Sequence, residues 1–386
     1  MAKPFTFVCL DPHKSKRAKI SALLGPMGKV RWLQLPMMGL HDWPQTQDRA
    51  ETALLAGRGI PKPGLARTIW KRILRMQYNG TRAYFEKNPT HVAVGWNGLN
   101  GSRRVFMDAA KDAGAKTLFF ELSPFPGRIT VDPVGVNNAN GLPRDPQPYQ
   151  AWLAASGHDP SGWRDLGAAI KQRTPDHPPA PTANLPSLQD PFIFAPLQVP
   201  GDSQLRLFGG EFRTVDAFVK ALIYAAAALP EGWHLRLKEH PSTRPFVAAM
   251  LRGVKAPIYL DNTTDTFAQV AASRGVVTIN SSVGLEAMFF DKPVTACGDC
   301  FWTIPGMADR APDQNALTAA MANAASWQFD AHVRDAVLSF LDQVYYPQAS
   351  ETMDSQAAHE ASQQVAQRLS GPDEFGFWAH PNQAKS

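Results

Sequence analysis

The sequence Leu235-Arg236-Leu237-Lys238-Glu239-His240-Pro241 has the apolar alternation of a strand and ends abruptly in charged residues and a proline. In a parallel sheet the carboxyl end of a strand faces the ligand crevice, so we expect Lys238 and His240 to emerge there. Cationic side chains at that edge suit a phosphate group. Pro241 stops the strand and restricts His240 to extended geometry, which would hold the imidazole at the edge. A surface turn with a solvated Lys and His remains the alternative.

A second apolar strand runs into a helical pattern at Val276-Val277-Thr278-Ile279-Asn280-Ser281-Ser282-Val283-Gly284-Leu285-Glu286-Ala287. Free backbone N–H groups and the small polar side chains of Asn280, Ser281 and Ser282 meet at this helix N-terminus and predict an anion cradle. Glu286 lies about one turn beyond Ser282, where a carboxylate can accept hydrogen bonds from ribose hydroxyls. An ordinary serine helix cap remains the alternative. Because both motifs end core strands of the same half, together they predict a nucleotide site.

Around these motifs, buried strands and helices alternate in two successive series, which is typical of parallel βαβ units and predicts an α/β fold. Neither series opens with a Walker A or G-x-G-x-x-G motif, which argues against a P-loop NTPase and an ordinary dinucleotide enzyme. The expected strands are residues 5–10, 30–35, 91–96, 117–121, 192–197, 234–238, 258–260, 276–279 and 293–296. The expected helices are residues 65–87, 103–113, 215–229, 244–251, 264–272, 283–290, 316–325, 332–343 and 355–369.

The length of 386 residues exceeds that of a usual single core, so we expect two domains. The proline-rich stretch 173–191 cannot be a central strand or a helix interior, because proline donates no backbone hydrogen bond. We therefore predict an N-terminal domain over residues 1–172 and a linker over 173–191. A nucleotide-binding domain over 192–330 follows, and C-terminal helices with a polar tail occupy 331–386.

The composition, with 44% hydrophobic and 19% charged residues, is that of a packed globular protein. The net charge of +5 favours anionic partners, but the basic residues are scattered, so nucleic acid is not an expected partner. No long apolar run or secretory signal is present, so we expect a cytoplasmic location. The pair Cys297 and Cys300 has zinc-like or redox-like spacing but lacks a second pair of ligands, which favours a plain loop.

Two carboxylates follow apolar strands and are candidates for chemistry. Glu121 closes the strand at 117–121 and enters a proline-constrained loop, where it could act as an acid, a base or a substrate ligand. A cap or a loop salt bridge is its alternative role. Asp202 follows the strand at 192–197, and we expect it at the interdomain edge as well.

These landmarks resemble, in their order, the capsule polysaccharide biosynthesis proteins that include the KpsS and KpsC β-Kdo transferases. The resemblance covers roughly residues 90–300 and implies a GT-B-like fold, with two Rossmann-like domains facing a central cleft. The matching landmarks are Glu121 with Asp132-Pro133-Val134-Gly135-Val136-Asn137, Pro196-Leu197-Gln198-Val199 with Asp202-Ser203-Gln204, Lys238-Glu239-His240-Pro241, and Asn280-Ser281-Ser282-Val283-Gly284-Leu285-Glu286-Ala287.

The resemblance also implies roles for individual residues. Retaining β-Kdo transferases are thought to use one carboxylate to attack the anomeric carbon and a second group to assist the acceptor hydroxyl. Carried over, Asp202 is the nucleophile and Glu121 the acid/base, with His240 as a third catalytic residue; exchange of the two carboxylate roles remains open. The expected nucleotide-binding residues are Lys238, His240, Pro241, Asn280, Ser281, Ser282 and Glu286. The expected substrate-binding residues are Arg128, Asp132, Asn137 and Gln204.

The function implied is transfer of Kdo from CMP-Kdo to a lipid or oligosaccharide acceptor, with no cofactor and, in the absence of an Asp-x-Asp motif, no metal. Capsule assembly proteins and the inner membrane are further expected contacts. Trp32, Trp43, Trp70 and the basic-apolar segment 68–76 could dock on an anionic membrane surface, although core packing is the alternative for all of them. Two other functions remain open: transfer of another CMP-sugar such as sialic acid, and a noncatalytic role in polysaccharide assembly.

Overall fold

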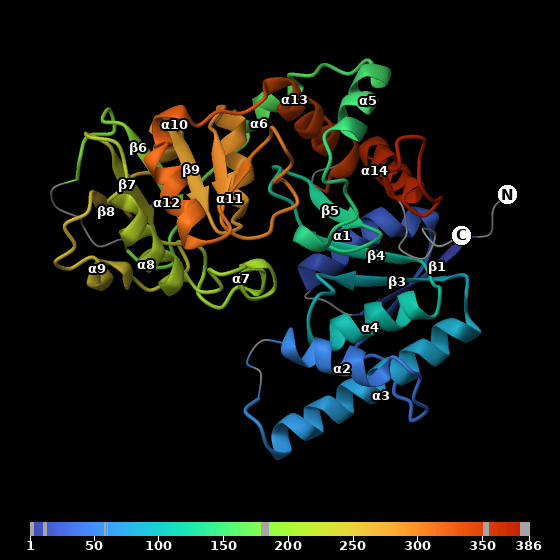
Figure 1. Ribbon diagram of the computed structural model, residues 1–386. Helices are drawn as coiled ribbons and strands as arrows, with labels where there is room; N and C mark the ends of the chain where they lie inside the picture. The colour runs from blue at the N-terminus through green and yellow to red at the C-terminus, as the bar shows by residue number, and fades with distance from the viewer. Residues whose placement is uncertain are drawn as a thin grey trace. The chain divides into compact units, whose positions relative to one another are not determined.

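The computed structural model describes residues 4–10, 14–57, 59, 61–178, 185–349 and 355–378. The chain divides into two compact units. Unit 1 contains Met1–Pro143 together with Phe340–Ser386, and unit 2 contains Arg144–Ser339 (Figure 1). Each unit is built around its own sheet.

Unit 1 has a five-stranded sheet in the order β2-β1-β3-β4-β5. All neighbouring strands are parallel except β5, which is antiparallel to β4. The order of its first four strands is that of a doubly wound fold. The strands are β1 Phe5–Leu10, β2 Gly28–Leu33, β3 His91–Trp96, β4 Thr117–Leu122 and β5 Ile129–Asp132.

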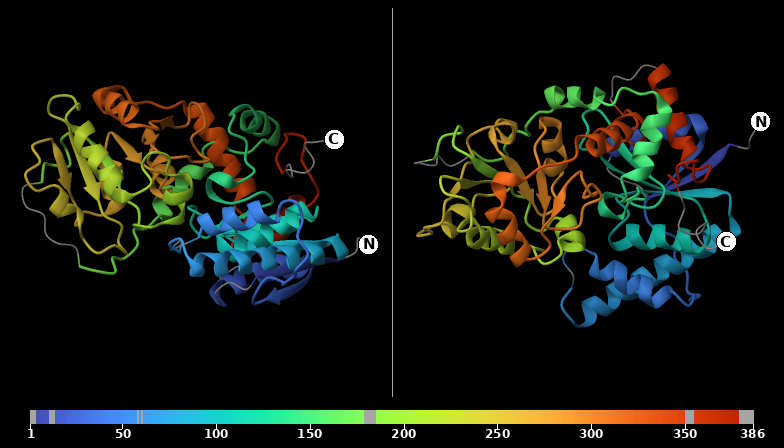
Figure 2. Two further views of the ribbon diagram at one scale, coloured as in Figure 1. Left: turned by 60° about the horizontal axis from the view of Figure 1, so that its bottom comes forward. Right: turned by 45° about the horizontal axis from the view of Figure 1, so that its top comes forward.

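Helices cover both faces of this sheet. Phe7, Val94 and Phe120 share a core with α1 (Lys14–Leu24) and with α14 (Ser355–Gln367) from the far end of the chain. Figure 2 shows this last helix, in red, beside the blue α1. The opposite face is covered by α4 (Gly101–Asp112), because a Cβ on Gly95 of β3 would lie 2.8 Å from the Met107 sulfur. Helices α2 (Thr46–Leu55) and α3 (Leu65–Lys87) pack against α4.

Unit 2 has a six-stranded, fully parallel sheet in the order β8-β7-β6-β9-β10-β11. This is the 3-2-1-4-5-6 order of the Rossmann fold, whose topological switch point lies between β6 and β9. The strands are β6 Phe192–Pro196, β7 His234–Lys238, β8 Ile258–Leu260, β9 Gly275–Thr278, β10 Val294–Ala296 and β11 Asp309–Arg310.

The two faces of the unit 2 sheet carry different helices. Residues that alternate along the strands, such as Ile193, Leu235 and Val277, form one core with α8 (Val215–Ala226) and α12 (Gln314–Ala322). The short helices α10 (Thr266–Ala272) and α11 (Ser282–Ala287) contact β6, β9 and β10. The remaining helices are α5 Gln147–Ser156, α6 Leu166–Ala169, α7 Ser203–Phe208, α9 Val247–Met250 and α13 Ala331–Phe340.

The division between the units differs from the predicted boundary at residue 172, because residues 144–172 belong to unit 2. Trp163 Nε1 and Arg164 Nη1 both donate to Asp335 Oδ1 of α13, which ties this segment to unit 2. The segment 331–386 is also not a separate appendage. Helix α13 stays with unit 2 up to Ser339, whereas α14 completes the core of unit 1.

Most predicted strands and helices are confirmed to within a few residues. The strand expected at 30–35 is β2 at Gly28–Leu33, and the helix expected at 244–251 is shortened to α9 because Pro245 interrupts its start. The described parts of the proline-rich stretch, 173–178 and 185–191, contain no helix or strand. Residues 179–184 and the predicted tail 379–386 lie outside the described residues. Among the described helices, none is both long enough and apolar enough to cross a bilayer.

Candidate functional site

Three neighbouring strands of unit 2 end beside one another at the topological switch point. The parallel register places Pro196 of β6 beside Lys238 of β7, and β6 also pairs with β9 on its other side. The segments that follow these strands therefore start at one edge of the sheet. These segments carry Asp202, His240 and Ser282, so the predicted residues of the two motifs follow strands that are neighbours in the unit 2 sheet.

Gln198 and Asn280 lock two of these segments together. Gln198 Nε2 donates to Asn280 Oδ1 at 2.9 Å, and the Asn280 backbone N–H donates to Gln198 Oε1 at 3.3 Å. Asn280 Nδ2 donates in turn to the backbone oxygen of Gln204 at 3.1 Å. The side chain of Asn280 is thus occupied within the protein, which favours a positioning role over the predicted nucleotide contact. Gln198 was not predicted as a site residue, although its place directly after a buried strand could have indicated it.

The serine-rich turn combines a helix cap with a reachable hydroxyl. Ser281 Oγ accepts from the Val283 backbone N–H at 3.2 Å, so this serine is the N-cap of α11. Ser282 is exposed and hydrogen-bonds to Glu286 one turn later. Burial raises the pKa of the Glu286 carboxyl to about 7. Ser282 and Glu286 therefore form a polar pair beside the strand end.

His240 has a defined ring orientation. Its Nδ1 accepts from the Ser242 backbone N–H at 3.1 Å, so the neutral ring carries its proton on Nε2. Burial, together with the positive charge of Arg173, lowers the pKa of His240, while the carboxylates of Asp202 and Asp176 act in the opposite direction. The neutral imidazole can thus donate a hydrogen bond from Nε2 at neutral pH.

Asp202 is both a helix cap and a neighbour of His240. Its Oδ1 accepts from the Gln204 backbone N–H at 2.9 Å and begins α7. The Asp202 carboxylate is half-buried, and its charge acts on the His240 ring. The predicted substrate ligand Gln204 contributes its backbone to both the cap and the contact with Asn280.

The ammonium group of Lys238 is hydrogen-bonded within the protein. Its Nζ donates to the backbone oxygens of Asn262 at 3.1 Å and Thr264 at 2.5 Å, and burial lowers its pKa. Glu239 is similarly occupied, because it accepts from the Phe246 and Val247 backbone N–H groups. These contacts favour a role for Lys238 in shaping the loops, in place of the predicted phosphate contact.

The first part of the proline-rich stretch forms a wall beside the His-Pro segment. The Asp176 backbone N–H donates to the Pro241 oxygen at 2.9 Å, and Gln172 Oε1 accepts from both the backbone N–H and the hydroxyl of Thr266. A small pocket lies here, lined by Gln172, Pro175, His177, Lys238, Glu239, His240, Pro241, Thr243, Pro245, Asn262 and Thr266. Pro241 and His240 thus line this pocket, whereas Asp202, Ser282 and Glu286 do not.

Glu121 lies at the carboxyl end of β4 in unit 1. Its Oε1 accepts from Trp96 Nε1 at 3.1 Å and from the Leu122 backbone N–H at 2.9 Å, and Oε2 accepts from Asn97 Nδ2 at 2.8 Å. The side chain is half-buried. Three donors therefore hold the carboxylate in one orientation at the strand end. Trp96 and Asn97 are partners that sequence reasoning did not single out.

The three predicted substrate ligands of unit 1 have different surroundings. Asp132 is fully buried and accepts from the backbone N–H groups of Val134, Gly135 and Gly141 and from the Tyr345 hydroxyl, which favours a structural role. Arg128 pairs with Asp342 at 2.6 Å and donates to the Tyr346 oxygen at 3.0 Å. Asn137 occupies a turn with a left-handed φ of 54°. Among the described residues, no group of His, Cys, Asp or Glu side chains could hold a metal ion.

Comparison with known proteins confirms the predicted family. Residues 162–343 match the family model described as "Capsule polysaccharide biosynthesis protein". Protein FixF of Sinorhizobium fredii is 33% identical over 261 residues, which are 68% of this chain and 61% of FixF. The capsule polysaccharide modification protein LipB of Neisseria meningitidis serogroup A is 27% identical over 31% of this chain and 30% of LipB. The chain thus spans less than two thirds of the length of either relative.

A solved structure shares the fold. The β-Kdo 2,7 transferase of Thermosulfurimonas dismutans KpsC superposes with a TM-score of 0.52 at 13% identity, covering 95% of this chain and 99% of that chain. Together with the two strand orders, this likeness confirms the predicted α/β fold of the GT-B kind, with two Rossmann-like domains.

Proposed function

We propose that the chain is a glycosyltransferase of bacterial capsule or surface polysaccharide synthesis that transfers Kdo from CMP-Kdo, with retention, to a lipid or glycolipid acceptor. The observation that carries the proposal is the position of Asp202, His240 and Ser282 after adjacent strands of a Rossmann sheet. Nucleotides bind at this position of open α/β sheets. The family match of the same unit supports a role in capsule synthesis.

In this proposal unit 2 binds the CMP part of the donor. His240 donates from Nε2 to the phosphate, because its Nδ1 is already satisfied by Ser242. The Ser282 hydroxyl and the start of α11 add further donors, and Glu286 accepts from the ribose hydroxyls. No cofactor or metal is part of the proposal.

The chemistry proposed is a double displacement. The Asp202 carboxylate attacks the anomeric carbon of Kdo, the bond to the phosphate oxygen breaks, and CMP leaves with that electron pair. The acceptor hydroxyl then attacks the same carbon, Glu121 takes its proton, and the bond to Asp202 breaks. Two inversions at one carbon give net retention.

Intact-protein mass spectrometry with CMP-Kdo tests this proposal. The Glu121→Gln variant lacks the base of the second step, so it should accumulate a Kdo adduct on Asp202, located by peptide mapping. Asp202→Asn is the matched control and should carry no adduct. An adduct on Glu121 in the wild-type protein would exchange the two roles. Turnover with CMP-sialic acid but not with CMP-Kdo would replace the donor, and polysaccharide binding without turnover of either would indicate an assembly protein.

The acceptor side belongs to the same proposal. A lipid or oligosaccharide acceptor, with peripheral contact to the inner membrane and to capsule assembly proteins, fits a transferase of surface polysaccharide. A mass-spectrometric assay of CMP-Kdo with lysophosphatidylglycerol and with an oligosaccharide would separate the two acceptor classes.

A further inference from the structure

Helix α3 is buried along one half only. Its buried residues start at Leu74 and include Tyr78 and Phe85, whereas no residue of the segment 65–73 is buried. Leu74 and Tyr78 pack in a core with α2 and α4. The first half of α3 therefore extends beyond the core of unit 1.

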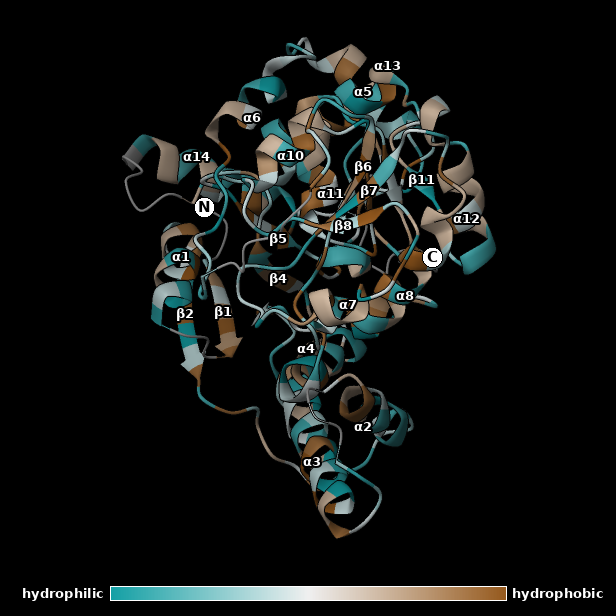
Figure 3. Cartoon of the chain, turned by 90° about the vertical axis from the view of Figure 1, so that its left-hand side faces the viewer, coloured by the Kyte–Doolittle hydropathy of each residue, from teal (hydrophilic) through white to brown (hydrophobic). Residues whose placement is uncertain are grey.

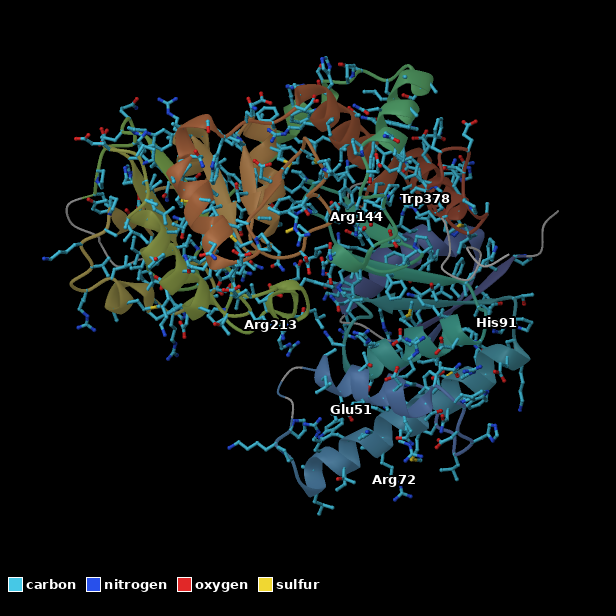
Figure 4. All side chains as sticks on the ribbon, in the orientation of Figure 1. Glu51, Arg72, His91, Arg144, Arg213 and Trp378 are labelled. Atoms are coloured by element: carbon cyan, nitrogen blue, oxygen red, sulfur yellow. The ribbon has the colours of Figure 1, made fainter. Side chains whose placement is uncertain are left out.

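The contacts of this half define its inner and outer sides. Arg67 Nη2 and Lys71 Nζ each lie 2.7 Å from the Glu51 carboxylate of α2. Leu74 lies on the same side of α3 and packs in the core of unit 1. The spacing of residues 65, 69 and 72 along the helix places their side chains on the side of α3 that faces away from Glu51. Figure 4 shows Glu51 on α2 and Arg72 on the outer side of α3.

The outer side is apolar and exposed. Leu65 is 77% exposed and Ile69 is 49% exposed. Trp70 is 51% exposed and directly follows Ile69, so it lies on the flank of α3, between the outer side and the side that faces α2. Figure 3 shows hydrophobic residues, in brown, at this end of the helix. Monomeric proteins rarely leave large side chains clustered in water without a partner. By contrast, Trp32 and Trp43 are half-buried beside the cores of unit 1, so only Trp70 of the three tryptophans is on this surface.

A fixed loop adds a fourth apolar residue. Leu40 is 80% exposed and lines a hollow on α3 with Arg72 and Met76. Its loop is held because the Gly39 backbone N–H donates to the Met76 oxygen at 2.9 Å. A Cβ on Gly39 would lie 2.7 Å from the Gly80 backbone nitrogen, so only glycine permits this approach. We call the surface of Leu40, Leu65, Ile69, Trp70, Lys62 and Arg72 the α3 patch.

The charge around the α3 patch is positive. Residues 62–76 contain Lys62, Arg67, Lys71, Arg72 and Arg75 and no acidic residue. Glu51 pairs with two of these cations and Asp42 with a third, Arg75, which leaves three net positive charges. Lys62 and Arg72 are exposed beside the apolar side chains.

We propose that the α3 patch docks unit 1 on the surface of an anionic bilayer. Exposed Leu, Ile and Trp side chains insert at the headgroup boundary, and Lys and Arg pair with anionic headgroups. A second copy of the chain is a poorer occupant, because a two-fold interface would bring this positively charged patch against the same positively charged patch of the copy. The proposal assigns the membrane contact of the proposed function to the α3 patch. It does not depend on which sugar the enzyme transfers.

Vesicle sedimentation of the full chain tests the proposal. The wild-type protein should sediment with vesicles containing phosphatidylglycerol, less so at high salt, and should remain free with phosphatidylcholine vesicles. The double variant Leu65→Gln, Ile69→Gln should reduce the partition coefficient about tenfold or more. Arg72→Gln should reduce it about fivefold. Tyr224→Gln, at a 68% exposed aromatic of unit 2, is the matched control and should change nothing.

Three results would overturn the proposal: no wild-type binding to phosphatidylglycerol vesicles, undiminished binding of the double variant, or a wild-type dimer in sedimentation equilibrium that the double variant dissociates. Transfer to a water-soluble oligosaccharide acceptor separates this inference from the proposed function. The double variant should keep that activity, because the substitutions lie on the surface of unit 1 and remove no buried contact.

Discussion

Gln198 and Asn280 hold the ends of β6 and β9 together through two hydrogen bonds across the topological switch point. Both side chains are almost fully buried. The amide of Asn280 also fixes the Gln204 backbone, which Asp202 caps. The position of the proposed nucleophile therefore depends on an amide pair whose hydrogen bonds are made within the protein.

Gln198→Ala should test this dependence. The substitution leaves the Asn280 Oδ1 and backbone N–H without their partner in a buried site, at a cost of about 1–3 kcal/mol in the free energy of unfolding. Urea unfolding measures the stability, and calorimetry should show weaker CMP binding. Gln189→Ala, at an exposed glutamine before β6, is the control. Unchanged stability and affinity would contradict the assigned role of the pair.

His240→Ala should weaken CMP binding by about 1.5–3 kcal/mol, because it removes the proposed Nε2–H donor to a charged phosphate. Titration calorimetry with CMP measures the loss. His332→Ala, at an exposed histidine of α13, is the matched control and should bind as the wild type does. Equal affinities of the two variants would reduce His240 to a turn residue.

Asp202→Asn should abolish transfer while leaving the affinity for CMP within a few fold, as expected of a group that acts in the transition state. Asparagine is also a good N-cap, so α7 should keep its start and the folded protein its stability. Asp202→Ala additionally loses the cap, at a cost of about 1 kcal/mol. Activity measurements and CMP titrations on both variants distinguish the loss of the reacting carboxylate from the loss of the helix cap of α7. Turnover by the Asn variant close to that of the wild type would exclude Asp202 as nucleophile.

Glu286→Gln should stabilise the protein increasingly as the pH rises above about 4.3, with the full gain reached above about pH 7. The pKa of Glu286 is raised to about 7 by burial, so ionisation is disfavoured in the folded state. The wild type therefore loses stability as the pH rises from about 4.3, the unfolded value, to about 7. The Gln variant should exceed it by about 3–4 kcal/mol at pH 8 and match it below about pH 4. Glu231→Gln, at an exposed site, is the control for urea unfolding at both pH values; a gain independent of pH would refute the assignment.

Asp132→Ala should destabilise unit 1 without affecting CMP binding, since the buried Asp132 carboxylate accepts from four donors within unit 1, whereas the proposed CMP site lies in unit 2. We expect a loss of about 2–4 kcal/mol in the free energy of unfolding. Asp48→Ala, at an exposed carboxylate of the same unit, is the comparison. A variant of unchanged stability with a raised acceptor KM would return Asp132 to the predicted substrate-binding role.

The sequence predicted the two Rossmann-like sheets and the strand ends of the site, because buried strands and the polar residues after them leave a local pattern. It could not predict which of those polar residues are already occupied. Lys238 is the last residue of β7 and His240 follows it, yet the ammonium of Lys238 is satisfied by the backbone carbonyls of residues 262 and 264. Such partners come from other loops, so strand pattern alone does not show them.

The domain boundary was misplaced for a related reason. The proline-rich stretch is the most conspicuous break in the sequence, but the segment before it is fixed to unit 2 by Trp163 and Arg164. The return of α14 to unit 1 likewise depends on distant contacts. Arg368 donates to the backbone oxygens of Val131 and Tyr345. Arg368 and Val131 are more than 200 positions apart in the sequence.

The closure of unit 1 by α14 has a consequence for biosynthesis. Unit 2 is complete once Ser339 has left the ribosome, whereas the sheet of unit 1 still lacks the helix that covers Phe7 and Phe120. Domains generally fold as units during synthesis, so the middle of the chain should fold before its beginning. One face of the unit 1 sheet is thus only partly covered, by α1, until α14 is made, and this interval is where a chaperone would be needed.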